Sequence, residues 1–169
     1  MTSQHGGRSA TGASTLRGRD WPALRQFCVF VENHVGSLQE LMRQVESDEV
    51  RVIGLSVVDS IDFAVVRMMF DNYERAQEAL KLSSFPFSEK DLIGVELPDD
   101  PQPYARICTV LVQAEVNIAY SYPLLFRRRG RGAVALCVDD VDQGIRALSD
   151  AGIAIVTENE LLEDDEMGL

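Results

Sequence analysis

The stretch FCVFVENHVGSLQEL, residues 27–41, contains the signals of a strand, a tight turn and the start of a helix. Its first five residues, Phe27 to Val31, form an unbroken apolar run rich in aromatic and β-branched side chains, which is typical of a strand buried on both faces. Ser37 is a candidate helix cap. The apolar residues that follow it recur every three or four positions and predict an amphipathic helix: Leu38, Leu41, Met42 and Val45.

The turn between these two elements, Asn33 to Leu38, has the features of an anion-binding turn. Gly36 carries no side chain, so the backbone there can come close to a ligand. The first N–H groups of a helix have no partner within the helix and point out of its N-terminus. A small anion such as a carboxylate is stabilised in that position. We therefore treat this turn as a candidate ligand site.

The same order of elements occurs twice along the chain. Equivalent apolar positions lie 66 to 68 residues apart, as in Leu41 with Ile107, Val50 with Val116, and Leu80 with Leu148. A shared element order with matching core positions indicates an internal repeat. The predicted strands cover residues 27–31, 50–58, 63–70, 85–87, 92–97, 116–124, 133–138 and 153–156, and the predicted helices start near residues 37, 73, 104 and 141.

This pattern predicts an α+β fold made of two ferredoxin-like βαββαβ domains in tandem. We expect a flexible tail over residues 1–22, domains over 23–90 and 91–161, and an acidic tail over 162–169. Right-handed crossovers place both helices of a domain on one face of an antiparallel sheet. Because several strands are apolar on both sides, we expect the other sheet face to be covered by a second subunit, as in a homodimer.

The composition argues against several classes of function. The 169 residues have a formal net charge of −11, and an acidic chain repels the phosphates of nucleic acids. No apolar stretch approaches the roughly 20 residues of a membrane-spanning helix. The three cysteines, Cys28, Cys108 and Cys137, are far apart among apolar neighbours, like buried thiols in a reducing compartment. We expect a cytoplasmic protein that binds neither nucleic acid nor membranes.

The repeat and its two turns resemble the ACT domain. In that family a turn of the form N/D-x-P-G-x-L leads into the first helix, and a V-N-I stretch begins the second strand. In the first half Asn33, Gly36 and Leu38 match, whereas Val35 stands in place of the proline and Arg51 in place of the V-N-I asparagine. In the second half Asp99, Pro101 and Asn117 match, whereas Gln102 replaces the glycine and Tyr104 the leucine.

The resemblance implies a non-catalytic regulatory module that binds an amino acid or similar metabolite at an interface between ACT domains, usually in a dimer. It covers about residues 24–161, and it is greatest for small tandem-ACT proteins similar to the regulatory subunit of acetolactate synthase. The candidate ligand-binding residues are Asn33, His34, Val35, Gly36, Ser37, Leu38, Asp99, Asp100, Asn117 and Ile118. Of the two turns, the one at Gly36 is the better preserved, because a side chain at 102 would crowd a ligand.

Each candidate also has a simpler interpretation. Asn33 and Asp99 could hold an ammonium group, or they could cap their own turns. His34 has no serine or cysteine with a companion acid that would make a catalytic triad, so we expect no catalytic residues. The acids at Asp99–Asp100 and Asp139–Asp140 stand where turns and helix starts favour acids, so we expect no metal and no cofactor.

Two functions therefore remain open. The chain could sense a small amino acid, or it could be an interaction subunit that binds no ligand and docks on an amino-acid biosynthetic enzyme. The basic segment Arg127–Arg131 is either a solvated hairpin or a docking point for an acidic surface.

Overall fold

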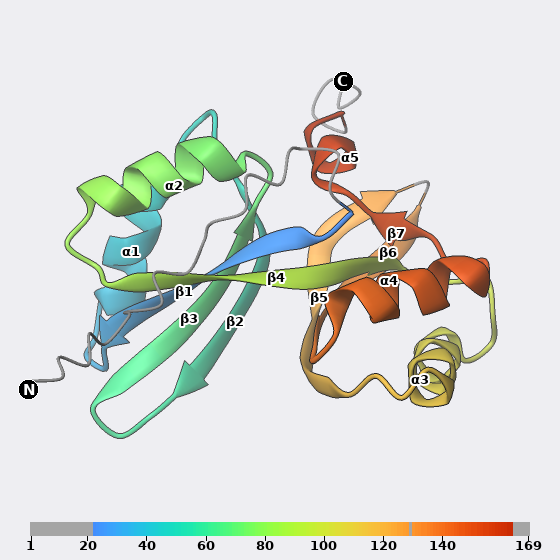
Figure 1. Cartoon of the computed structure of the whole chain (residues 1–169). Helices are drawn as coiled ribbons and strands as arrows, with labels where there is room; N and C mark the ends of the chain where they lie inside the picture. Colours follow the sequence, from blue (N-terminus) through green and yellow to red (C-terminus); the bar gives the residue numbers. More distant parts are fainter. Residues whose placement is uncertain (1–21, 129, 164–169) are drawn as a thin grey trace, which may run out of the picture.

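The computed structural model describes residues 22–128 and 130–163 (Figure 1). Both predicted tails therefore lie almost wholly outside the described residues. The first half contains β1 (Leu24–Glu32), α1 (Ser37–Val45), β2 (Val52–Asp59), β3 (Phe63–Phe70) and α2 (Tyr73–Leu82). The remainder contains β4 (Phe87–Glu96), α3 (Pro103–Gln113), β5 (Ile118–Arg128), β6 (Arg131–Val138), α4 (Val141–Asp150), β7 (Ile155–Val156) and α5 (Glu158–Glu163).

The strands form one antiparallel sheet. Their order is β1-β3-β2-β5-β6-β4-β7, and β4 pairs with β1 as well. The junction between β2 and β5 is narrow, with Gly54 opposite Leu124. Gly54 allows a close approach there, because a Cβ atom would stand 3.0 Å from the side chain of Leu124, which would have to shift. Because β4 pairs with both β6 and β1, the strands of the two halves form one closed sheet. The mainly antiparallel sheet with helices packed on it is an α+β fold.

Strand β4 differs from the sequence-based prediction. Residues 85–87 and 92–97 were expected to be separate strands in separate domains, but residues 87–96 form one continuous strand. Its first part pairs with β1, from Leu24 opposite Leu92 to Val29 opposite Phe87. Its last part pairs with β6, from Ile93 to Glu96. The polar residues 88–91 hide the strand in the sequence, and backbone pairing with β1 holds them extended.

Each half packs two helices on one side of its strands. Phe27, Leu41 and Leu80 belong to the apolar cluster beneath α1 and α2. Ile107, Leu136 and Leu148 belong to the cluster beneath α3 and α4. The predicted amphipathic stripes are therefore the buried faces of these helices. The two helix pairs lie on opposite sides of the view in Figure 1.

A third apolar cluster fills the space between the halves. It contains residues of both, including Leu24, Ile53, Met69, Leu92, Tyr122 and Ala135. Part of the sheet surface that we expected a second subunit to cover is therefore buried within the chain itself. The part that stays exposed lies at the far end of the first half, where Phe30 and Phe63 form an aromatic pair with ring centroids 6.2 Å apart.

The central cluster also contains a hydrogen-bonded polar group. Gln26 is fully buried, donates to the Tyr120 hydroxyl at 2.9 Å and accepts from the Tyr122 hydroxyl at 2.7 Å. Burial raises the pKa of Tyr120 to about 12, although the hydrogen bond from Gln26 opposes the shift. Burial also raises the pKa of Tyr122. Both phenols therefore stay neutral at physiological pH, and the contact joins β1 to β5 without a buried charge.

Equivalent contacts in the two halves follow the repeat. The carboxylate of Asp71 accepts a hydrogen bond from the Arg51 amide at 2.8 Å, and that of Asp139 accepts one from the Asn117 amide at 2.9 Å. Strands β5 and β6 reach Arg128 and Arg131, well into the segment 126–132 that was predicted as a loop.

The acidic end of the chain is partly ordered, which the sequence did not predict. Glu158 begins helix α5 and accepts two hydrogen bonds from the guanidinium of Arg25, at 2.7 and 2.6 Å. That guanidinium also stacks on the ring of Tyr73, 3.3 Å from its centroid. The contact fastens α5 to the first half. In the described part of the chain, no helix combines the length and apolar character needed to cross a membrane.

Candidate functional site

The N-terminus of α1 is open and has backbone donors available. Gly36 caps the helix in a left-handed conformation, with φ 94°, and its side-chain position is empty to beyond 4 Å. No side chain caps the helix. Within the described residues, the amides of Leu38 and Gln39 donate to no backbone or side-chain acceptor. A non-glycine residue at this φ would be strained, so the glycine sets the shape of the turn.

Ser37 has a buried hydroxyl that makes no hydrogen bond with the described residues. Its side-chain oxygen is shielded from solvent, and the residue is only 6% exposed. The sequence suggested that this hydroxyl would cap α1, but Gly36 occupies the cap position and Ser37 is the first helical residue. A buried polar group without a partner is unfavourable by about 1–3 kcal/mol. Such groups are rare in folded proteins, and one at a helix N-terminus suggests a missing acceptor or donor.

Asn33 is held against the hairpin between β2 and β3. Its side-chain amide donates to the carboxylate of Asp59 at 2.7 Å and to the carbonyl of Ser60 at 3.4 Å. Its backbone amide donates to the carbonyl of Asp62 at 3.4 Å. These contacts leave the Asn33 side-chain oxygen available as an acceptor. They also bring the carboxylate of Asp59 to the turn, although the sequence analysis did not select that residue.

The other residues of the first turn are exposed. His34 lies 3.8 Å from the carboxylate of Glu32, and its ring is near the carbonyl of Val35. Val35 is fully exposed, and Leu38 is partly exposed. The apolar surface around the turn also includes Ile61, which is 95% exposed at the hairpin tip.

The corresponding turn of the second half is built differently. Gln102 caps α3 with φ −130°, and Pro103 is the first helical residue. The backbone amide of Gln102 donates a hydrogen bond to the carboxylate of Asp100 at 2.8 Å. Asp99 is paired with Arg131 at 3.3 Å, so its carboxylate already has a cation nearby. Pro103 stands where the first half has Ser37, and it lacks both a hydroxyl and an amide hydrogen.

Helix α3 is also tied to the sheet of its own half. The hydroxyl groups of Tyr104 and Ser121 share a hydrogen bond, which joins α3 to β5. Asp100 lies 3.8 Å from the guanidinium of Arg106, one turn into the helix. The side chains of this corner, which comprises the second turn and the start of α3, therefore bind to one another.

The structure does not bring the two turns together within one chain. Helix α1 packs with α2 and β1, whereas α3 packs with α4. Figure 1 shows α1 and α3 on opposite sides of the molecule. Asn117 is exposed at the start of β5, and its side-chain amide binds none of the described residues. Ile118 packs against the apolar cluster of the second half.

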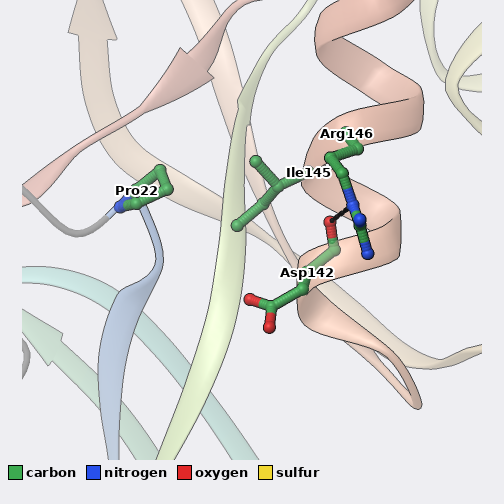
Figure 2. Close-up of a pocket in the computed structure, with 4 residues that line it drawn as sticks. All are labelled: Pro22, Asp142, Ile145 and Arg146. Carbon is green, nitrogen blue, oxygen red and sulfur yellow. Dashed lines mark hydrogen bonds between the residues drawn. The ribbon is translucent and has the colours of Figure 1, made fainter.

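A separate pocket of about 350 Å³ lies beside α4. It is lined by Asp142, Ile145 and Arg146 of that helix and by Pro22, just before β1 (Figure 2). Figure 2 shows Ile145 pointing toward Pro22, with the carboxylate of Asp142 near it. Sequence analysis did not identify this pocket, because Pro22 and α4 are more than a hundred residues apart.

Within the described ranges, no group of three or more histidine, cysteine or acidic side chains is arranged to hold a metal ion. The three cysteines are free; Cys137 is buried, and Cys28 and Cys108 are half-buried.

Known proteins resemble this chain in sequence pattern and fold. The model of the ACT domain pair matches residues 23–164. No curated protein matches the chain. Protein BT0572 from Bacteroides thetaiotaomicron is similar in structure, with a TM-score of 0.74, 23% identity, and coverage of 83% of this chain and 96% of that one.

The regulatory subunit of aspartate kinase from Thermus thermophilus, in its ligand-free form, is also similar. Its TM-score is 0.54 with 14% identity, over 79% of this chain and 95% of that chain. At these identities the likeness concerns the fold. The family match covers most of the chain, including both turns and every described strand. This chain therefore belongs to the ACT domain pair family.

Proposed function

We propose that the protein is a regulatory sensor that binds a small amino acid at the N-terminus of α1. The observation that carries the proposal is the buried, unpartnered hydroxyl of Ser37 beside two free backbone amides. A carboxylate would accept hydrogen bonds from these groups and would be stabilised by the helix dipole. Hydrogen bonds to a charged group contribute about 1.5–3 kcal/mol each. This chemistry supports an anion site in the first half.

The other end of the ligand would be held by oxygen atoms. Asn33 and Asp59 are joined by a 2.7 Å hydrogen bond, which leaves the Asn33 carbonyl and the second carboxylate oxygen of Asp59 as acceptors. An ammonium group needs such acceptors. In the described chain no lysine or arginine pairs with Asp59. The same turn thus offers donors for a carboxylate and acceptors for an ammonium, and an α-amino acid carries both.

We further propose that a second copy of the chain completes the site. In the family, effectors bind where ACT domains meet. Asn117, Ile118, Asp99 and Asp100 cannot reach α1 within one chain, so they would contribute only from a neighbouring molecule. The exposed apolar residues near the first turn, among them Phe30, Val35, Ile61 and Phe63, provide a surface for such contact. We also propose that each half of the chain is a ferredoxin-like βαββαβ domain.

Binding would regulate a partner and would involve no catalysis. The sequence offers no recognisable triad, the described residues contain no metal-binding cluster, and ACT domains are regulatory. Coupling between an effector site and a partner is typically about 1–3 kcal/mol, which changes a partner's activity several-fold to about a hundredfold. The cytoplasm, where amino-acid biosynthetic enzymes act, is the compartment that we propose.

The second candidate function is an interaction subunit that binds no ligand. The closed second turn favours it, because Asp100 and Pro103 leave that corner without the features of the first. The two functions differ in one result. The sensor binds at least one of the twenty amino acids at the N-terminus of α1, whereas the interaction subunit binds none there.

The test begins with a thermal-shift screen of the twenty amino acids against the purified full chain. Each amino acid that raises the melting temperature is then titrated into the protein by calorimetry. Gly36→Asp should abolish binding at the α1 site, because it places a charged side chain at the mouth of the carboxylate site. Gln102→Asp places an aspartate at the equivalent position of the second turn and should leave binding unchanged. Equal loss in both variants, or none in Gly36→Asp, contradicts the proposed site. No hit in the screen favours the interaction subunit.

A further inference from the structure

The pocket beside α4 combines an apolar wall with two charged groups of opposite sign. Ile145 and Pro22 supply the apolar wall, while Asp142 and Arg146 supply a carboxylate and a guanidinium. The three α4 residues stand at positions i, i+3 and i+4, which places them on one face of the helix. Figure 2 shows Ile145 directed toward Pro22 and the Arg146 side chain running along the helix toward the backbone of Asp142.

The two charged side chains do not satisfy each other. An acid and a base four residues apart on a helix often form an ion pair. Here the Nε atom of Arg146 instead donates to the backbone carbonyl of Asp142 at 3.2 Å, and the carboxylate of Asp142 receives no hydrogen bond from it. Among residues 22–128 and 130–163, no partner within ion-pair distance is found for the Asp142 carboxylate or the outer nitrogens of Arg146.

We propose that this pocket is a second metabolite site, for an α-amino acid with an apolar side chain. The guanidinium of Arg146 would bind the ligand carboxylate, and Asp142 would bind its ammonium group. The apolar side chain of the ligand would lie on Ile145 and Pro22. A ligand with only one charge would leave the other protein charge unpaired.

The volume of the pocket agrees with this ligand class. At about 350 Å³ it is near the lower end of the roughly 300–1,000 Å³ that small-molecule pockets span. A nucleotide or a large cofactor needs the upper part of that range. The pocket also lies between the start of β1 and a helix of the other half, so a ligand there would contact both halves of the chain.

The site is separate from the one at α1. Asp142 and Arg146 lie on α4, and Figure 1 shows α4 on the side of the molecule away from α1. Its ligand would not need the free amides of α1 or the hydroxyl of Ser37. The two sites can therefore be tested independently.

The experiment is a titration of the ¹⁵N-labelled full chain followed by amide chemical shifts, with L-leucine as the probe. The background variant is Gly36→Asp, which blocks the α1 site. We expect the amides of Gly144, Ile145 and Arg146 to shift with a dissociation constant of about 1 mM or tighter. The analogues 4-methylpentanoate and 3-methylbutylamine each lack one charge and should bind at least about tenfold more weakly.

The variants Asp142→Asn and Arg146→Gln should each weaken leucine binding by at least about tenfold. Glu78→Gln and Lys81→Gln remove the same charges from α2 and should leave the titration unchanged. The inference is overturned if leucine up to about 20 mM moves no α4 amide. It is also overturned if the analogues bind as well as leucine, or if Arg146→Gln has no effect. Leucine shifts at α4 without amino-acid binding at α1 would contradict the proposed function and support this inference.

Discussion

The first turns of the two halves occupy equivalent places in the repeat, yet their polar groups are used in opposite ways. At α1, Gly36 opens the turn, the Ser37 hydroxyl is buried without a partner, and two amides are free. At α3, 66 residues later, Gln102 and Pro103 stand in place of Gly36 and Ser37. There the carboxylate of Asp100 accepts a hydrogen bond from the backbone amide of Gln102. One corner keeps donors available for a ligand, whereas the other uses its side chains to hold the local structure.

On the proposed function, this difference places the binding role in only one of the two repeated halves. Both turns lead from a strand into a helix of similar length. At the helix N-terminus both the side chains and the backbone conformation differ, with φ 94° at Gly36 and φ −130° at Gln102. The family motif already favoured the Gly36 turn, and the local hydrogen bonds add a physical reason for the difference.

The strongest test exchanges the two corners. Replacing Gly36, Ser37 and Leu38 with the Gln, Pro and Tyr found at the second turn should lower amino-acid affinity by more than about a hundredfold. The reason is that the exchange removes a hydroxyl, an amide hydrogen and the open space above the glycine. Calorimetric titration measures the affinity, and circular dichroism checks that α1 persists.

The reverse exchange, with Gly, Ser and Leu at positions 102–104, is the matched control. It should leave affinity at the first turn within about twofold of the unmodified chain. If it lowers affinity as much as the first exchange, the two corners are functionally equivalent and the comparison fails.

A smaller effect is expected for Asp59→Asn. Loss of the carboxylate should weaken amino-acid binding by about tenfold or more, because a charged acceptor for the ammonium is lost. Affinity for the deaminated analogue of the same amino acid should change little. Calorimetry with both ligands gives the ratio. Asp62→Asn changes the other acid of the same hairpin turn and should affect neither ligand, so an equal effect of both variants would rule out a specific contact.

Ser37→Ala should separate stability from binding. Removing a buried hydroxyl without a partner should raise the free energy of unfolding of the ligand-free protein by about 1 kcal/mol. The same change should weaken ligand binding by about two- to tenfold, since one hydrogen bond is lost. Urea unfolding and calorimetry measure the two effects. Ser84→Ala, at an exposed position, is the control. Lower stability in Ser37→Ala would mean that the hydroxyl already has a partner.

The smallest effect is expected for Tyr104→Phe at the second corner. Loss of its hydrogen bond to Ser121 should lower the free energy of unfolding by about 0.5 kcal/mol, because the pair is exposed. Amino-acid affinity should be unchanged. Thermal unfolding and titration together provide the measurement. A clear loss of affinity would indicate that the second corner takes part in binding.

Much of the fold follows from the sequence because its signals are local and repeated. The apolar stripes of α1 and α4 and the run from Phe27 to Val31 predict their elements directly. The repeat predicts the tandem arrangement, and the family match supports it. The continuous strand β4 could not be predicted in the same way, because residues 88–91 are polar and only their pairing with β1 holds them in the sheet.

The candidate site was predictable to a similar degree. The glycine and serine of the first turn can be recognised from their order before an amphipathic helix. Asp59 could not be selected, because its role depends on a hydrogen bond to Asn33, 26 residues earlier. The ion pair of Glu158 with Arg25 could not be predicted for the same reason. In the sequence Glu158 is one acid among several, and only the fold places it beside Arg25. Long-range contacts of this kind have no local pattern.

Strand β4 has a consequence for how the protein can be divided. Because its ten residues serve one half with their first part and the other half with their last, a cut after Lys90 would leave each fragment with an incomplete strand. Fragments meant to fold alone would both have to contain residues 87–96. The halves therefore share one strand as well as a repeated sequence pattern, and a change in the twist of that strand would alter both halves.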